Sequence, residues 1–207
     1  MNIIWIDEVW RWPWFGPIVA CSCLFDFKQN IDKNFLNQIT DSKKLTHKKR
    51  QIIFKELIKL SSNKKPWLYF GVWVVDNYFI DKYNIAIANK EAMKRSLTDI
   101  FFKIKPSKNI QVLIDWNYNY SFDDFWNIKY LSVIGWDLKH VEIWAASIIA
   151  KVFRDEMMWV YNLLYPWFDL DKHKWYWTKK HKEYLKSKKN ISWFHRITYK
   201  PIQNILN

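Results

Sequence analysis

The chain has 207 residues and carries 33 Lys and Arg against 20 Asp and Glu, which gives a net charge of +13 at pH 7. That length is typical of one domain of about 100–200 residues, with room for at most a small extension. Half of the residues are apolar and 26% are charged, which excludes a disordered chain. No apolar run approaches the ~18 residues that span a bilayer, and acids at positions 7 and 8 interrupt any secretory signal. We therefore expect a cytoplasmic protein with no membrane partner.

Two cysteines, Cys21 and Cys23, are too few for a disulfide framework or a four-cysteine zinc site. Their spacing places both on one face of a strand, where they are expected as small core residues. The five histidines show no spacing typical of metal ligands.

Apolar runs and helical periodicities alternate along the chain. In chain order they predict strands at 2–6 and 18–25, a helix at 48–60 capped by Thr46, a strand at 68–75, a helix at 85–104, strands at 110–114 and 130–134, and a helix at 143–164. Strands that alternate with helices indicate an α/β fold whose sheet contains some parallel pairing.

Acidic residues lie at or just beyond the ends of three predicted strands: Asp7, Glu8, Asp115 and Asp137. Ligands of open α/β sheets bind beyond the carboxyl ends of strands. Carboxylates gathered there repel one another, and hard divalent cations relieve that repulsion. Each acid alone is equally typical of a surface residue that ends a strand. Because neighbouring strand residues point to opposite faces, Asp7 and Glu8 share a site only if the strand bends or a backbone carbonyl replaces one side chain.

The C-terminal part of the chain is strongly basic. Residues 171–200 contain ten Lys and Arg but two Asp and Glu, and aromatic residues alternate with these charges. Such a run fits a solvated helical face. It also fits a surface that contacts phosphates with its cations and stacks bases on its rings.

Several segments together resemble one known family, ribonuclease HII. They are residues 2–19 (NIIWIDEVWRWPWFGPIV), 41–45 (DSKKL), 113–117 (LIDWN), 136–137 (WD), 145–155 (AASIIAKVFRD), 173–178 (HKWYWT) and 195–196 (HR). The resemblance covers nearly the whole chain in order. An N-terminal substrate-binding domain and a G-K-G segment, typical of the related ribonuclease HIII, are not expected, because the DE pair begins at residue 7 and Arg11 is present.

The resemblance implies an RNase H-like mixed sheet flanked by helices, in a catalytic domain at 1–165 with a small, basic, helical extension at 166–207. It implies an endonuclease that hydrolyses RNA paired with DNA, cuts at ribonucleotides embedded in duplex DNA, and leaves 5′-phosphate and 3′-hydroxyl ends. Two Mg²⁺ or Mn²⁺ ions would serve as cofactors, and the enzyme would act as a monomer. The alternative is a non-catalytic nucleic-acid-binding protein.

By position, the resemblance implies roles for individual residues. Asp7, Glu8, Asp115 and Asp137 correspond to the four catalytic, metal-binding carboxylates. The family's G-R-G segment, which reads ribose 2′-hydroxyls, corresponds to Trp10, Arg11 and Trp12. Tyr176 corresponds to a tyrosine that packs on a sugar beyond the cut. Lys43 and Lys44 correspond to lysines near the phosphates, although a solvated pair before a helix is the other interpretation.

Tryptophan is abnormally frequent: the chain has 15 Trp and only 3 Gly, where about 7% Gly, roughly 14 residues, is usual. Nine tryptophans stand where the family has, or usually has, glycine: Trp5, Trp10, Trp12, Trp73, Trp116, Trp136, Trp167, Trp175 and Trp177. We hypothesise that the source organism reads UGA as glycine and that these codons were translated as tryptophan. A chain made as written is expected to cleave poorly, because bulky rings would fill the substrate groove.

Overall fold

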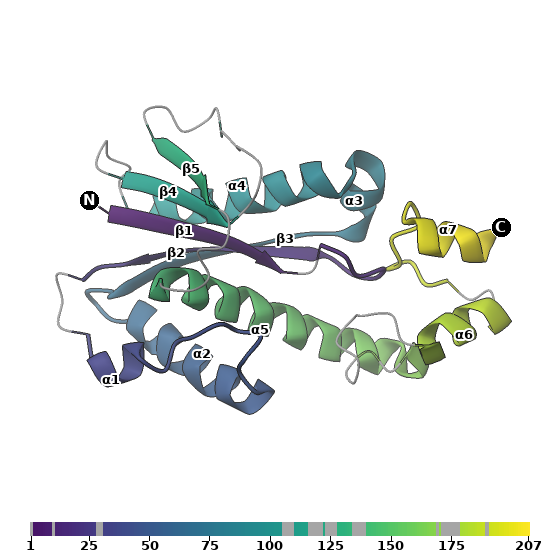
Figure 1. Cartoon of the computed structure of the whole chain (residues 1–207), viewed down its shortest axis with the longest axis horizontal. Helices are drawn as coiled ribbons and strands as arrows, with labels where there is room; N and C mark the ends of the chain where they lie inside the picture. Colours follow the sequence, from purple (N-terminus) through teal and green to yellow (C-terminus); the bar gives the residue numbers. More distant parts are fainter. Residues whose placement is uncertain are drawn as a thin grey trace.

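The computed structural model describes residues 2–9, 11–27, 31–104, 110–115, 122, 128–133, 140–168, 170, 179–188 and 191–207. Five strands form one mixed sheet with helices on both faces (Figure 1). In chain order the elements are β1 (Asn2–Val9), β2 (Ile18–Phe25), α1 (Lys33–Leu36), α2 (His47–Ser61), β3 (Leu68–Val75), α3 (Asn77–Tyr83), α4 (Ile85–Lys103), β4 (Ile110–Asp115), β5 (Lys129–Val133), α5 (Val141–Leu164), the 3-10 turn η1 (Pro166–Phe168), α6 (Lys179–Lys188) and α7 (Lys200–Leu206).

The strand order is β3-β2-β1-β4-β5, so β1 lies at the centre of the sheet. The first three strands form an antiparallel meander, in which β1 pairs with β2 and β2 with β3. β4 lies parallel to β1 on its other side, and β5 lies parallel to β4. This mixture of parallel and antiparallel pairs confirms the predicted α/β class with a mixed sheet.

Each face of the sheet is covered by its own helices (Figure 1). On one face, Ile4 and Ile6 of β1 pack with Ala92 and Leu97 of α4. On the other face, Val19, Cys21 and Cys23 of β2 pack with α2 and α5. Alternate residues of each strand thus enter different cores, as the period of a strand requires. The two cysteines are buried in the second core, which confirms their prediction as core residues.

A third core joins the C-terminal elements to the end of α5. Its buried members are Trp14, Phe15, Met158, Phe168, Leu170, Leu185, Ile202 and Ile205. Residues from the loop after β1, from α5, from η1 and from both C-terminal helices therefore share one cluster. The C-terminal elements lie beyond the end of the sheet toward which β1 points (Figure 1).

Gly71 in β3 permits the closest approach between the sheet and α4. A Cβ atom at this position would lie 2.0 Å from the carbonyl oxygen of Ser96 and 3.0 Å from Cβ of Asp99. No side chain fits there without moving the helix away from the sheet. Glycine at this position is therefore a requirement of packing.

Most predicted elements match the structure within a few residues, and β2 and β3 match their predicted bounds. The predicted cap is also present, since the Thr46 hydroxyl accepts a hydrogen bond from the Lys49 backbone N–H. β1 continues to Val9, three residues beyond its predicted end, because 7–9 pair with 19–21 of β2. Within the described ranges, every helix is too short or too polar to cross a lipid bilayer.

Candidate nucleic-acid and metal site

The parallel pairing of β1 and β4 brings two of the predicted acids to neighbouring positions. Ile6 is the register partner of Ile114, so the next residue on each strand is Asp7 and Asp115. Paired strands lie about 4.8 Å apart, and register neighbours project to the same face. The backbone thus places Asp7 and Asp115 side by side at the carboxyl end of β4. The Asp115 side chain and all of Asp137 lie outside the described residues.

Asp7 and Glu8 project to opposite faces of β1, because pairing with β2 is regular through both. Asp7 is opposite Cys21, in the core under α2 and α5, whereas Glu8 is opposite Ala20, in the core under α4. Burial raises the pKa of the Cys21 thiol well above its usual value, and the nearby Cys23 and the Asp7 carboxylate add to that increase. The Glu8 backbone N–H donates to Oδ1 of Asp7 at 2.8 Å. Glu8 therefore offers its backbone, and not its side chain, to the face that Asp7 occupies.

The donor set suits a hard divalent cation. Carboxylate oxygens are among the ligands that Mg²⁺ and Mn²⁺ prefer, so the acids at the adjacent register positions 7 and 115 are candidate metal ligands. Among the described side chains no cluster of three or more His, Cys, Asp or Glu could hold a metal ion. The carboxylates of Asp115 and Asp137 are not among these described side chains.

Arg11 lies on a segment that a buried arginine from the C-terminal part of the chain fixes in place. The Arg196 guanidinium donates to three backbone carbonyls, those of Gly16 at 2.9 Å, Arg11 at 2.8 Å and Pro17 at 3.2 Å. The Tyr199 hydroxyl donates to the same Arg11 carbonyl at 2.7 Å. Arg196 is fully buried, so these bonds replace the water that its charge loses. The backbone position of Arg11 is thereby set by residues 196 and 199.

Side chains at the tip of this segment remain accessible. The Arg11 guanidinium lies over the Trp12 ring, 5.2 Å from its centroid, and Trp12 is 73% exposed. A cation at this tip is suited to contact with phosphates. Trp10 and Tyr176, the other residues predicted to bind nucleic acid in this region, lie outside the described residues.

Lys43 and Lys44 are exposed on the turn that precedes α2. The turn is closed by hydrogen bonds from the Lys43 N–H to Oδ1 of Asp41 at 2.9 Å and from the Lys44 N–H to the Asp41 carbonyl at 3.0 Å. Both ammonium groups can therefore reach a phosphate in solution without losing a buried partner.

Two buried histidines join α6 to the segment that carries Arg196. Nε2 of His181 lies 3.2 Å from Nε2 of His195, and Nδ1 of His195 lies 2.9 Å from the Ser192 hydroxyl. Burial, together with the neighbouring His181, lowers the pKa of His195 to about 3. His195 is therefore neutral at physiological pH.

The sequence does not predict that Arg196 holds the segment at 11–17 in place. His195 and Arg196 stand out only as the HR segment of the resemblance. The available signal was weak, because a buried arginine looks like a surface arginine until its partners are known.

Comparisons with known proteins identify the family of this chain. Residues 4–202 match the family model for Ribonuclease HII. The chain is 39% identical over 205 residues to a Ribonuclease HII of Endomicrobium trichonymphae, covering 98% of this chain and 87% of that relative. Its fold is shared with the ribonuclease H2 from Pyrococcus horikoshii OT3 (TM-score 0.76, 24% identity, 100% and 97% covered). It is also shared with Bst-RNase HIII in complex with Mn²⁺ (TM-score 0.69, 17% identity, 100% and 69% covered).

The family match spans nearly the whole chain, and an identity of 39% over 205 residues is high enough to show family membership. The mixed five-stranded sheet is the fold of both structural neighbours. The chain therefore belongs to the ribonuclease HII family and is a ribonuclease H.

Proposed function

We propose that this protein cleaves the RNA strand of RNA–DNA hybrids and cuts at ribonucleotides embedded in duplex DNA, leaving 5′-phosphate and 3′-hydroxyl ends. The observation that carries the proposal is the β1–β4 register, which sets Asp7 beside Asp115 at the carboxyl end of a strand. Family membership supports the same activity.

We assign the metal site to Asp7, Glu8, Asp115 and Asp137, with Mg²⁺ or Mn²⁺ as the ion and two ions engaged when substrate is bound. Glu8 would contribute through its backbone carbonyl, because its side chain projects to the opposite face. When bound, such ions activate water and stabilise the leaving oxygen of a phosphodiester. A structural neighbour that was solved with Mn²⁺ supports a divalent ion.

We assign substrate contacts to Arg11 with positions 10 and 12, to Lys43 and Lys44, and to Tyr176. The ribose 2′-hydroxyl is the group that distinguishes RNA from DNA. A protein segment that recognises this one hydroxyl needs a backbone that is held in a fixed position. The anchoring of the Arg11 carbonyl supports this role. The lysines are suited to phosphates, and their contribution to affinity should fall as salt rises.

Asp7→Asn tests catalysis separately from binding. The change removes the charge of one proposed metal ligand and preserves its shape, so we expect cleavage of a duplex with one embedded ribonucleotide to fall about 10²–10³-fold, the cost of removing one charge-stabilising group. Affinity for the same duplex should change by less than about threefold. Unchanged cleavage would support the alternative, a nucleic-acid-binding protein without this active site. An all-DNA duplex serves as the control substrate.

We propose that the tryptophans at family glycine positions are decoding errors. Among the described residues, Trp5 is fully buried and contacts His140, with ring centroids 4.8 Å apart, whereas Trp12 is exposed. In the gene, UGA codons at positions 5, 10 and 12 would support the proposal and UGG codons would refute it. A version with glycine restored should cleave faster than the chain as written, because overpacking costs about 1–3 kcal/mol per site.

We further propose that the enzyme is a cytoplasmic monomer with a division at residue 165 between catalytic domain and basic extension. The third core, which contains residues from both parts, supports their packing as one unit. A single sedimenting species of monomer mass would agree with this proposal, and a stable dimer would refute it.

A further inference from the structure

The turn that carries Lys43 and Lys44 is held at both ends by buried residues. Ser42 and Leu45 are 5% and 7% exposed, and the two exposed lysines stand between them. One guanidinium contacts both ends: Nη1 of Arg50 donates to the carbonyls of Ser42, at 2.8 Å, and Leu45, at 2.5 Å. Arg50 is therefore the common partner of the residues that flank the lysines.

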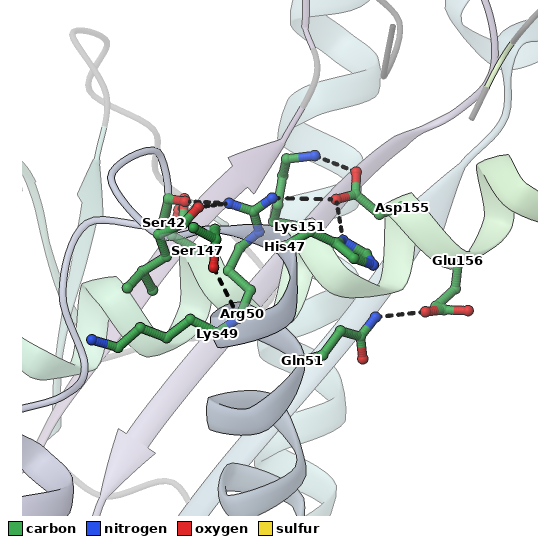
Figure 2. A network of polar contacts seen from close by, with 11 residues as sticks. Ser42, His47, Lys49, Arg50, Gln51, Ser147, Lys151, Asp155 and Glu156 are labelled. Carbon is green, nitrogen blue, oxygen red and sulfur yellow. Dashed lines mark hydrogen bonds and ion pairs between the residues drawn. The ribbon is translucent and has the colours of Figure 1, made fainter. Parts of the chain in front are cut away.

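A second contact fixes the same turn to α5. The Ser42 hydroxyl lies 2.9 Å from the Ser147 hydroxyl. Ser147 is on the helix that covers the face of the sheet to which Asp7 belongs. The turn is thus connected to α5, which covers the face of the sheet to which Asp7 belongs, as well as to α2, which follows the turn (Figure 2).

Asp155 of α5 faces Nη2 of Arg50, the terminal nitrogen that does not contact the turn. Nη2 of Arg50 lies 3.9 Å from Oδ2 of Asp155, and the Lys151 ammonium pairs with Oδ1 of the same carboxylate (Figure 2). Burial lowers the pKa of Lys151 to about 8, although Asp155 opposes that decrease. Arg50 is 6% exposed and Asp155 is 9% exposed. A partner on each side leaves the guanidinium little freedom to rotate.

We infer that Arg50 is a positioning residue for the reaction, which holds residues 42–45 so that Lys43 and Lys44 meet the substrate phosphates. This inference rests on the proposed function. Arg50 itself is buried beneath the turn and contacts backbone, so its effect on the substrate passes through the two lysines. An arginine is needed because its planar fork donates in several fixed directions, whereas a lysine presents one point charge.

The test uses the enzyme with glycine restored at the nine family glycine positions as its parent and compares Arg50→Lys with that parent on an RNA–DNA hybrid. We expect KM to rise about five- to tenfold, a cost of about 1–1.4 kcal/mol, with kcat within about twofold. The decisive measurement repeats the change in a Lys43→Ala/Lys44→Ala background. If Arg50 acts through the lysines, Arg50→Lys should leave KM unchanged there, which is the non-additivity of coupled residues. An equal rise in KM in both backgrounds would overturn the inference.

Two further variants keep the test decisive. Gln51→Ala removes another contact between α2 and α5, the 2.6 Å hydrogen bond to Glu156, which does not touch the turn. It should leave KM unchanged, and a rise like that of Arg50→Lys would show a general loss of helix packing and refute the inference. If Arg50→Lys does not fold, Ser42→Ala takes its place, with an expected rise in KM of about twofold that is absent in the lysine-free background. A glycine-restored parent enzyme that does not cleave the hybrid would refute the proposed function, which no result from an Arg50 variant can do.

Discussion

His195 makes the stability of this protein depend on pH between about 6.5 and 3. Its imidazole is buried against Phe15 and Phe168, with ring centroids 4.9 and 5.2 Å away, and faces His181 and Ser192. Burial lowers its pKa to about 3 from the usual 6.5. As pH falls below 6.5, the unfolded chain binds a proton at this histidine while the folded chain does not. The contribution of His195 to the free energy of unfolding is therefore fully present above pH 6.5 and decreases as the solution becomes more acidic.

The size of the effect follows from the difference in pKa. Each pH unit below 6.5 lowers the free energy of unfolding by about 1.4 kcal/mol, until the pH approaches the pKa that His195 has in the folded protein. At pH 5 the loss from His195 is therefore about 2 kcal/mol, before most carboxylates begin to titrate. That amount is a large fraction of the 5–15 kcal/mol that is typical for a folded domain.

His195→Gln removes the titrating group and keeps a polar side chain that can reach His181. Urea unfolding of wild type and variant at pH 7 and pH 5 should show the wild type losing about 2 kcal/mol more than the variant. An equal loss in wild type and His195→Gln would refute the assignment of acid sensitivity to this buried ring.

Two other substitutions test supports of the site and of the fold. Arg196→Lys should lower the free energy of unfolding by about 3 kcal/mol and expose the peptide bond after Arg11 to trypsin, since three carbonyls lose a charged donor; resistance equal to that of the wild type would contradict this. Gly71→Ala should cost about 3 kcal/mol, because its Cβ would lie 2.0 Å from the Ser96 carbonyl oxygen. Val74→Ala, a change at a half-exposed position of the same strand, is its control and should cost less than about 1 kcal/mol in thermal unfolding.

The strands and long helices were predictable because their apolar periods match their geometry. β2 is buried along its whole length and shows an uninterrupted run, and α5 shows a broad apolar face. α3 was not predicted, because it has seven residues and begins and ends on polar caps, Asp76 and Asn84. Asn84 has a φ of 71°, the only positive value among described residues other than glycine. Short helices of this kind are decided by capping and tertiary contacts more than by periodicity.

The candidate site was predictable only in part. Acids at strand ends are visible in a sequence, and strands that alternate with helices predict some parallel pairing. The register that sets Asp7 beside Asp115 is known only from the structure. The separation of Asp7 and Glu8 onto opposite faces also follows from the period of a strand. The anchoring of Arg11 by Arg196 joins residues 185 positions apart, and no local pattern encodes such a contact.

The separation between Arg11 and its anchor has a consequence for synthesis. Ribosomes build proteins from the amino end, so the segment at 11–17 emerges long before Arg196 exists. While translation continues, the bonds from Arg196 to the carbonyls of Arg11, Gly16 and Pro17 cannot form. The final arrangement of this segment therefore forms only after the C-terminal part of the chain has been made.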